Sequence, residues 1–432
     1  SEAQFQYYEG QDVGLPGTGT APIPAAADLT YPAIRRGLVN FKHTYQPGGD
    51  LLKESSLNLY YQYIDRRSRL DNFPEAAPLE EINPAADHDT LGATWNNKVT
   101  MAGHTVLTGL DVWQRELSSS RIRFLRNGQM LNDTPLPDAS FLSTGAFLVD
   151  SYKATDRLTL SGGGRVDALH VENDPTEVFS AEEDDDLAWN AHAGASLKLT
   201  DTITATAVAA RGYRAASLEE RYVFLDLGDG RVKLGNPNLD PERSTFFETG
   251  IHYVSSGLAL SVSGFFNSLD DLIADQIVDE ETIINANINQ AEIYGTETDV
   301  RVLLADLWQL YSSFSYARGR DTLNNEDLPG IAPFNGLAGL RYDEGDGFWG
   351  YSELKFSAEQ NNPPPGVDSS AEWIRVNMRL GYDFSAWQTE QTVYAGIDNI
   401  FDKGYSDYLT TSRGFVFNEP GRSFLVGYRT RF

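Results

Sequence analysis

The 432-residue chain has no cysteine, only three methionines and far fewer basic than acidic residues. Without cysteine it has no disulfides, no thiolate metal sites and no cysteine nucleophile. Met101, Met130 and Met378 are isolated in the sequence, which argues against copper capture by a methionine cluster. With 62 acidic residues against 34 basic ones and a net charge of −28, the chain would repel nucleic-acid phosphates, so no nucleic-acid partner is expected.

Long apolar runs are also absent. No run approaches the roughly 18 residues that a membrane-spanning helix needs, so a helical membrane protein is excluded. The first residues, SEAQFQYYEG, show neither the basic nor the apolar region of an export signal, which has been removed or was never part of this sequence. No G-x-S-x-G, phosphate-loop or H-E-x-x-H motif occurs, and we expect no enzyme. A hydrolase whose serine and histidine meet only in space is the remaining catalytic alternative.

What the chain does contain is strand periodicity and 12% aromatic residues. In LALSVSGFFN, from Leu258, apolar side chains alternate with small and polar ones, and the C-terminal RSFLVGYRTRF repeats the pattern. About eighteen such segments occur, many near the roughly 10 residues of a tilted membrane-crossing strand. The sequence therefore predicts an all-β protein.

The connections between these segments alternate in length. Short turns such as Ser255–Gly257 follow every second strand, and long polar segments such as 67–89, 171–186 and 358–372 lie between them. This asymmetry is typical of a transmembrane antiparallel outer-membrane β-barrel, which must close because hydrocarbon leaves no strand edge unpaired. A β-solenoid or propeller is the alternative, but its fixed repeat period is not visible.

Several motifs resemble those of TonB-dependent outer-membrane receptors, over about residues 140–432. YRAASLEERY is similar to the F-R-A-P box of that family, and GNPNLDPERS is similar to its N-P-N-L box. NINQAEIYGTETDV resembles a strand motif of the family, through Asn289, Ala291, Gly295 and Glu297. The other residues that carry the resemblance are Tyr213, Arg214, Asn236, Pro237, Asn238, Leu239, Asn399, Phe401, Asp402, Tyr405 and the terminal Phe432.

The resemblance implies a location in the outer membrane of Gram-negative bacteria and a barrel of about 22 strands around a plug. Residues 1–432 would then be one partial barrel domain, without the plug and the first strands. The implied function is TonB-energised uptake of a scarce ligand, a ferric siderophore or other iron complex. The alternatives are a plug-free general or substrate-specific porin, and a heme, cobalamin or metal receptor of the same family.

Arginines beside an aromatic residue are the candidate ligand contacts. SSSRIRFLRNG is predicted to be an outer loop, and its arginines suit an anionic siderophore or, equally, lipid phosphates. A second arginine patch is predicted in IDRRSRL. GNPNLDPERS is interpreted as a loop-shaping segment or a ligand contact. The ligand-binding candidates are Arg121, Arg123, Phe124, Arg126, Tyr222, Arg66 and Arg67, with Arg69 in the second patch.

Metal and heme sites have weaker support. No histidine lies between the two boxes, and Ala216 stands where the F-R-A-P box has proline, which disfavours heme. His88, flanked by two aspartates, is a candidate metal ligand. Asp184, Asp185 and Asp186 belong to an acidic run predicted to be a loop that binds Ca²⁺ or is simply solvated. No other cofactor is expected.

The remaining expectations concern partners. The resemblance implies contact with the TonB–ExbB–ExbD complex through the missing plug, and we expect Glu353, Lys355, Arg429 and Arg431 to face that plug. Outer-membrane lipids and lipopolysaccharide are expected around the strands, and a small-molecule iron complex in the loops. We expect the protein to be a monomer.

Overall fold

The structure is a computed structural model that describes all residues except 16–27, 227–231, 280–281, 366, 412–417 and 432. The terminal Phe432 therefore lies outside the described residues, as does the side chain of Asn289. Two compact units can be distinguished. Unit 1 comprises residues 1–195, 209–245 and 269–290, and unit 2 comprises residues 196–208, 246–268 and 291–432.

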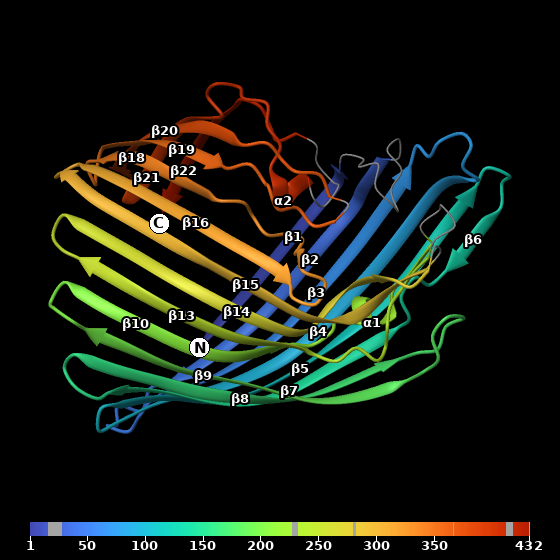
Figure 1. The fold of residues 1–432 in the computed structure, drawn as a ribbon, viewed down its shortest axis with the longest axis horizontal. Helices are drawn as coiled ribbons and strands as arrows, with labels where there is room; N and C mark the ends of the chain where they lie inside the picture. Colours follow the sequence, from blue (N-terminus) through green and yellow to red (C-terminus); the bar gives the residue numbers. More distant parts are fainter. Residues whose placement is uncertain (16–27, 227–231, 280–281, 366, 412–417, 432) are drawn as a thin grey trace. The chain divides into compact units, whose positions relative to one another are not determined.

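The described residues form 22 strands and two short helices (Figure 1). In chain order they are β1 (Glu2–Leu15), β2 (Asp28–Tyr45), β3 (Leu52–Asp71), β4 (Leu79–Met101), β5 (His104–Leu125), β6 (Met130–Asp133), β7 (Ala139–Lys153), β8 (Leu158–Asn173), β9 (Glu183–Lys198), β10 (Ile203–Arg214), α1 (Leu218–Tyr222), β11 (Phe224–Asp226), β12 (Val232–Leu234), β13 (Glu242–Val254), β14 (Leu258–Ile277), β15 (Thr282–Ala305), β16 (Trp308–Asp321), β17 (Glu326–Asp327), β18 (Asn335–Asp343), β19 (Phe348–Ser357), β20 (Trp373–Ala386), β21 (Thr389–Asp398), α2 (Tyr408–Thr411) and β22 (Ser423–Arg431).

Four of these strands, β6, β11, β12 and β17, have four residues or fewer, and the other eighteen have at least nine. The long strands pair antiparallel with the next long strand along the chain, from β1 to β5 in unit 1 and from β18 to β22 in unit 2. Short turns follow every second long strand, as at Ser255–Gly257 and Ala102–Gly103. The expectations of about eighteen long strands and of alternating connection lengths are confirmed.

Several predicted long loops are shorter than expected because the strands continue into them. β3 and β4 leave only residues 72–78 as the connection within the predicted segment 67–89. β9 begins at Glu183, so Asp184, Asp185 and Asp186 are strand residues and the prediction of an acidic loop is wrong there. The connection 358–372 has the predicted bounds.

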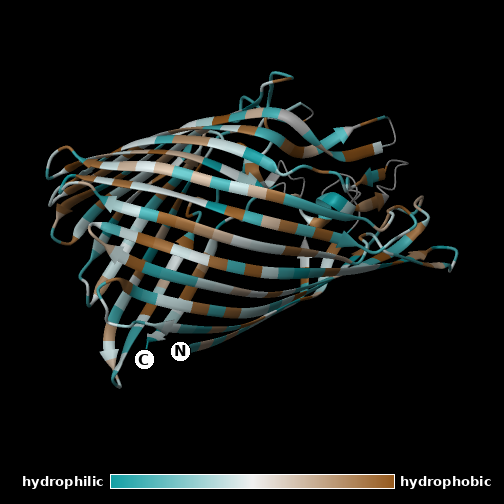
Figure 2. Ribbon diagram, turned by 90° about the horizontal axis from the view of Figure 1, so that it is seen from below, coloured by the Kyte–Doolittle hydropathy of each residue, from teal (hydrophilic) through white to brown (hydrophobic). Residues whose placement is uncertain are grey.

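Hydrophobic and polar residues alternate along the strands (Figure 2). On β22 the side chains of Phe424, Val426 and Tyr428 are strongly exposed, whereas Arg429 and Arg431 belong to the other face. None of the helices in the described part of the chain is long and apolar enough to span a membrane.

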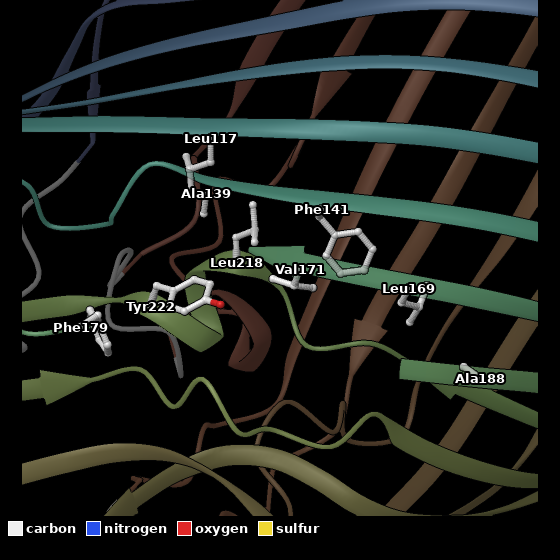
Figure 3. Close-up of a cluster of buried hydrophobic side chains, with 9 residues drawn as sticks. All are labelled: Leu117, Ala139, Phe141, Leu169, Val171, Phe179, Ala188, Leu218 and Tyr222. Carbon is white, nitrogen blue, oxygen red and sulfur yellow. The ribbon is translucent and has the colours of Figure 1, made fainter. Parts of the chain in front are cut away.

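The main hydrophobic cluster of unit 1 lies where α1 packs on the strands (Figure 3). Leu218 and Tyr222 of α1 belong to one buried cluster with side chains of β5, β7, β8 and β9, and Tyr222 meets Phe179 edge to face at 5.9 Å between ring centroids. The buried strand residues are Leu117, Ala139, Phe141, Leu169, Val171 and Ala188. We call the face of β1–β9 that carries Leu117 the α1 face, and the other the opposite face.

Candidate functional site

α1 is a five-residue helix, and its first turn is stabilised by a capping box. The Ser217 hydroxyl accepts the Glu220 N–H at 3.1 Å, and the Glu220 carboxylate accepts the Ser217 N–H at 2.8 Å. The two contacts satisfy amides that have no partner inside the helix. The segment SLEE of the F-R-A-P-like box therefore specifies the start of α1 through its own side chains.

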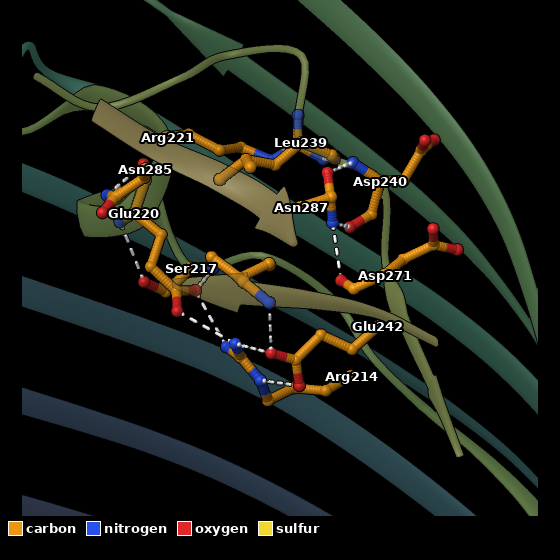
Figure 4. A network of polar contacts seen from close by, with 11 residues as sticks. Arg214, Ser217, Glu220, Arg221, Leu239, Asp240, Glu242, Asp271, Asn285 and Asn287 are labelled. Atoms are coloured by element: carbon orange, nitrogen blue, oxygen red, sulfur yellow. Dashed lines mark hydrogen bonds and ion pairs between the residues drawn. The ribbon is translucent and has the colours of Figure 1, made fainter. Parts of the chain in front are cut away.

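Arg214, at the end of β10, joins α1 to β13 (Figure 4). Its guanidinium donates to both carboxylate oxygens of Glu220, at 2.8 and 3.0 Å, and to both of Glu242, at 2.7 and 2.6 Å. Burial alone would raise the pKa of Glu220, but the hydrogen bonds from Arg214 and Ser217 outweigh it and leave the pKa below the ordinary value of 4.5. Arg214 of the F-R-A-P-like box thus binds Glu242 of the N-P-N-L-like box.

Arg221 is the second link between the two boxes, and its side chain is 99% buried. It donates to the carbonyl oxygens of Pro237 and Leu239, the latter at 3.1 Å. It also pairs with Asp184 at 2.7 Å and Asp186 at 3.2 Å. A buried guanidinium must be matched by charge and acceptors, and these four groups supply them to the two terminal nitrogens, whereas Nε has no acceptor in the described part of the chain.

Two asparagines of β15 that the sequence analysis missed complete this junction. Asn285 Nδ2 donates to the Glu220 carbonyl oxygen at 2.8 Å. Asn287 Nδ2 donates to the carbonyl oxygens of Asp240 and Asp271, and its Oδ1 accepts the Asp240 N–H at 2.9 Å (Figure 4). Their spacing of two residues in NANINQ places both on one face of a strand, a signal that could have been used.

The N-P-N-L-like box is shaped by its own residues as well. Asn236 Oδ1 accepts the Asn238 N–H at 3.0 Å, which is an Asx turn. Gly235 must be glycine, because a Cβ there would lie 2.6 Å from the Tyr222 amide nitrogen. Leu239 is 98% buried. In the structure this box forms a tightly packed junction with α1.

The predicted arginine loop is a β-hairpin of β5 and β6. Arg121 is buried and donates to both carboxylate oxygens of Asp133, at 2.8 and 2.5 Å, and Arg123 pairs with the same carboxylate at 3.1 Å. Phe124 follows on the other face by strand alternation. Arg126 lies in the turn and donates to the carbonyl oxygens of Phe73 and Ala77. Arg121 is thus committed to internal contacts, and the part of the predicted outer loop up to Leu125 is strand.

The second predicted arginine patch is divided by β3. Arg67 pairs with Asp65 at 2.6 Å and with Asp87 at 3.2 Å on the opposite face. Arg69 pairs with Asp71 at 3.2 Å. Arg66 lies beside Ala86, which packs against the α1 cluster, and so belongs to the α1 face. The three arginines do not form one patch, because neighbouring strand residues point to opposite faces.

Tyr222 and the candidate metal ligands have other partners. Tyr222 is 99% buried in the cluster under α1. His88 Nε2 lies 3.8 Å from Glu219 of α1. Asp185 contacts His170 Nδ1 at 2.8 Å, while its two neighbours bind Arg221. Among the residues that the structure describes, no group of three or more His, Cys, Asp or Glu side chains is arranged to hold a metal ion.

Two arginines of the α1 face have no carboxylate within ion-pair distance in the described part of the chain. Arg66 on β3 and Arg115 on β5 flank His88, since Arg66 is opposite Ala86 and Arg115 is opposite Thr90 in the register of β4. Arg115 Cζ is 5.6 Å from the Trp113 ring centroid. The structure therefore brings one predicted ligand contact, Arg66, next to an arginine that the sequence analysis missed.

The opposite face of the same strands carries the other sign of charge. Among the residues that line a hollow of 750 Å³, Asp87, Asp89, Glu116, Glu172 and Glu183 belong to the opposite face of these strands, and Asp138, Asp174 and Glu182 belong to the adjoining connections. Asp89 and Glu116 are directly paired in the register of β4 and β5. The strands of unit 1 thus present uncommitted arginines on the α1 face and an acidic hollow on the other.

In unit 2 the segment NIFDKGY forms a closed turn. Asn399, 99% buried and at φ 51°, accepts the Lys403 N–H at 2.9 Å and donates to the Lys403 carbonyl oxygen at 2.9 Å. Asp402 accepts the Arg422 N–H at 2.8 Å. Tyr405 is buried against Trp373, whereas Phe401 is strongly exposed. Three of these four motif residues have a structural contact in this turn.

The four residues expected to face the plug share one face of unit 2. Lys355 and Glu353 of β19 form an ion pair of 3.1 Å, and the Tyr311 hydroxyl donates to Glu353 at 3.2 Å. Arg431 pairs with Glu390 at 3.3 Å. Arg429 and Arg431 line a hollow of 640 Å³ near the turns of β18–β19 and β20–β21.

Comparisons with known proteins extend this description. A family model described as "TonB dependent receptor-like, beta-barrel" matches residues 3–400. The iron-regulated outer membrane virulence protein of Vibrio cholerae serotype O1 is 26% identical over 315 residues, which are 66% of this chain and 44% of that protein.

Among solved structures, the copper transporter OprC superposes with a TM-score of 0.81 at 22% identity, covering 94% of this chain and 66% of that one. The ferric citrate transporter FecA superposes with a TM-score of 0.74 at 16% identity, covering 99% and 67%. At these identities the likeness shows the fold alone. The chain spans less than half the length of the V. cholerae relative and about two thirds of the two transporters.

Proposed function

Because the chain belongs to the TonB-dependent receptor β-barrel family, we propose that it acts in the uptake of an anionic iron complex. The family fixes the fold class as an all-β outer-membrane β-barrel and the location as the outer membrane of Gram-negative bacteria. Its structural neighbours are transport receptors and not enzymes. The nature of the ligand, its binding residues and the energy source are parts of the proposal.

One observation carries the ligand class. Arg66 and Arg115 stand on the α1 face on either side of His88, without a carboxylate partner in the described residues. In a chain of net charge −28, arginines that are not neutralised internally are available to an anion. Iron is the proposed cargo because the V. cholerae relative is named as iron-regulated and FecA as a ferric citrate transporter.

The proposal assigns the energy source to the TonB–ExbB–ExbD complex, acting through a plug domain. Glu353, Arg429 and Arg431 are the proposed plug contacts, since they share one polar face of unit 2 with Lys355. Lipids are the proposed partners of the exposed apolar side chains Phe424, Val426 and Tyr428. The family match favours this receptor over a plug-free porin.

Neighbouring residues of β3 provide a matched test. The receptor is expressed from its own coding sequence in iron-limited cells, and uptake of a radioactive anionic ferric chelate is measured. Arg66→Gln or Arg115→Gln should slow uptake about tenfold, since each removes a charge-assisted contact with the anion. Arg67→Gln removes the same charge one residue away on the opposite face and should leave uptake unchanged. Equal effects of Arg66→Gln and Arg67→Gln would contradict the assignment.

A further inference from the structure

A second cationic cluster lies on β19 and β20 of unit 2. Arg375 packs against two aromatic rings, with Cζ 5.8 Å from the ring centroid of Trp373 and 5.7 Å from that of Tyr405. The two ring centroids are 4.7 Å apart. Cation–π attraction therefore positions the guanidinium, and no carboxylate of the described chain lies within ion-pair distance of it.

Two buried donors of this cluster have no acceptor. Trp373 is 9% exposed, and its Nε1–H makes no hydrogen bond in the described part of the chain. The Arg375 Nε atom is likewise buried and without an acceptor there. Buried donors in folded proteins nearly always have a partner, because an unmade hydrogen bond costs folding free energy. The two donors lie on neighbouring same-face positions of β20, so one anion could accept from both.

The strand register adds a second cation. Lys355 of β19 is directly opposite Arg375 of β20, and Ser357 is opposite Trp373. Like charges directly opposite each other destabilise a sheet unless an anion lies between them. The ion pair of Lys355 with Glu353, at 3.1 Å, neutralises only one of the two cations.

We propose that Arg375, Lys355 and Trp373 form a binding site for a carboxylate of the transported ligand, so that the iron complex is one with free carboxylates. This inference rests on the proposed function for the source of the ligand. A carboxylate fits because it can accept from a guanidinium, an ammonium group and an indole N–H together. An aryl group has no open ring to stack on, since Trp373 and Tyr405 are 9% and 7% exposed.

Binding of two iron complexes to outer-membrane vesicles that contain the whole receptor tests this site without requiring transport. The probes are ferric citrate, which has carboxylates, and an uncharged ferric trihydroxamate, which has none. Arg375→Gln should weaken ferric citrate binding about tenfold. Trp373→Phe keeps an aromatic ring beside Arg375 and removes the N–H, and we expect a smaller loss. Arg341→Gln, on the same face but paired with Asp343 at 2.5 Å, is the matched control and should bind as the unchanged receptor does.

Three results would overturn the site: unchanged ferric citrate binding by Arg375→Gln, an equal loss in Arg341→Gln, or an equal loss of ferric trihydroxamate binding. The last would show that Arg375 only supports the fold. Heat-dependent gel mobility of each variant identifies any that fails to fold, and Lys355→Gln then provides the second test. If vesicles bind ferric citrate as predicted but cells take up no iron complex, the proposed function fails while this site stands.

Discussion

Arg221 donates a 3.1 Å hydrogen bond to the carbonyl oxygen of Leu239, and both side chains are at least 98% buried. The two residues belong to the two motif segments that are most diagnostic in the sequence. A guanidinium in this position is stable only because Asp184 and Asp186 of β9 supply the opposite charge. The residues in this junction therefore contribute to the fold of the loop region and join the two boxes to each other and to β9.

Replacing Arg221 by methionine should loosen the junction strongly. The change leaves Asp184, Asp186 and two carbonyl groups without their partner, and breaking such a buried pair costs about 3–5 kcal/mol. Hydrogen exchange of the amides in residues 217–223 and 235–242 measures the loss. Arg243→Gln is the control, since Arg243 forms a half-exposed pair of 3.2 Å with Asp271, and should cost at most about 1 kcal/mol. Equal protection in the two variants would show that Arg221 is not the central link.

Acidification should open the same segment. The pKa of Glu220 is lowered in the folded state, so its contacts with Arg214 and Ser217 stabilise the fold above the ordinary pKa of 4.5 and lose this effect as the pH falls through the lower folded value. Protease cleavage after α1 should therefore increase below that pH. In Glu220→Gln the stabilisation is already absent, and the pH dependence over this range should be weaker. A Gln variant with the same pH profile would count against Glu220 as the titrating group.

A glycine and an aromatic residue form a further testable pair in unit 2. A Cβ at Gly339 of β18 would overlap the ring of Tyr311 on β16, so Gly339→Ala should destabilise the fold by about 1–3 kcal/mol. Tyr311→Ala removes the ring, and in the double variant Gly339→Ala should cost much less. Gly404→Ala is the control, because nothing lies within 4 Å of a Cβ there. The temperature at which the folded form is lost on gels reports each effect. If the destabilisation of the double variant equals the sum of the two single variants, the two residues do not overlap.

The Arg121–Asp133 pair makes a prediction for the β5–β6 hairpin. Arg121→Ala leaves the carboxylate of Asp133 with Arg123 alone. The amides of Met130–Asp133 should therefore exchange faster, with an opening free energy lower by about 1–3 kcal/mol. Replacing Arg121, Arg123 and Arg126 by glutamate reverses their charge and should weaken uptake of the iron complex mainly by disrupting this hairpin. If the triple variant kept normal exchange in β6 but lost uptake, the arginines would be ligand contacts as the sequence first suggested.

The sequence predicted features that depend on local alternation and turn chemistry. The strand character of LALSVSGFFN, which is the first half of β14, and the turn at Ser255–Gly257 follow from side chains within the segment itself. The acidic residues Asp184–Asp186 were expected in a loop because their partners, Arg221 and His170, are distant in sequence and cannot be recognised from the run alone. Tertiary ion pairs override the local preference of aspartate for loops here.

The same reason explains what was missed at the candidate site. Arg66 was predicted as a ligand contact together with Arg67, but only the register with Ala86 and Asp87 shows which of them belongs to the α1 face. Arg115 was not singled out, because its position next to His88 requires the pairing of β4 with β5. The capping box of α1, in contrast, is encoded within SLEE.

β3 separates two chemically different surfaces by the position of single residues in its sequence. Inserting one residue between Tyr63 and Ile64 would shift the register of the segment beyond it and exchange the sides on which Arg66 and Arg67 project. Arg66 would then meet the acidic surface, and Arg67 would turn to the α1 face without its aspartates. Length changes in this strand should therefore be far less tolerated than substitutions. A substitution alters one side chain, whereas an insertion moves every following side chain of the strand to the other face.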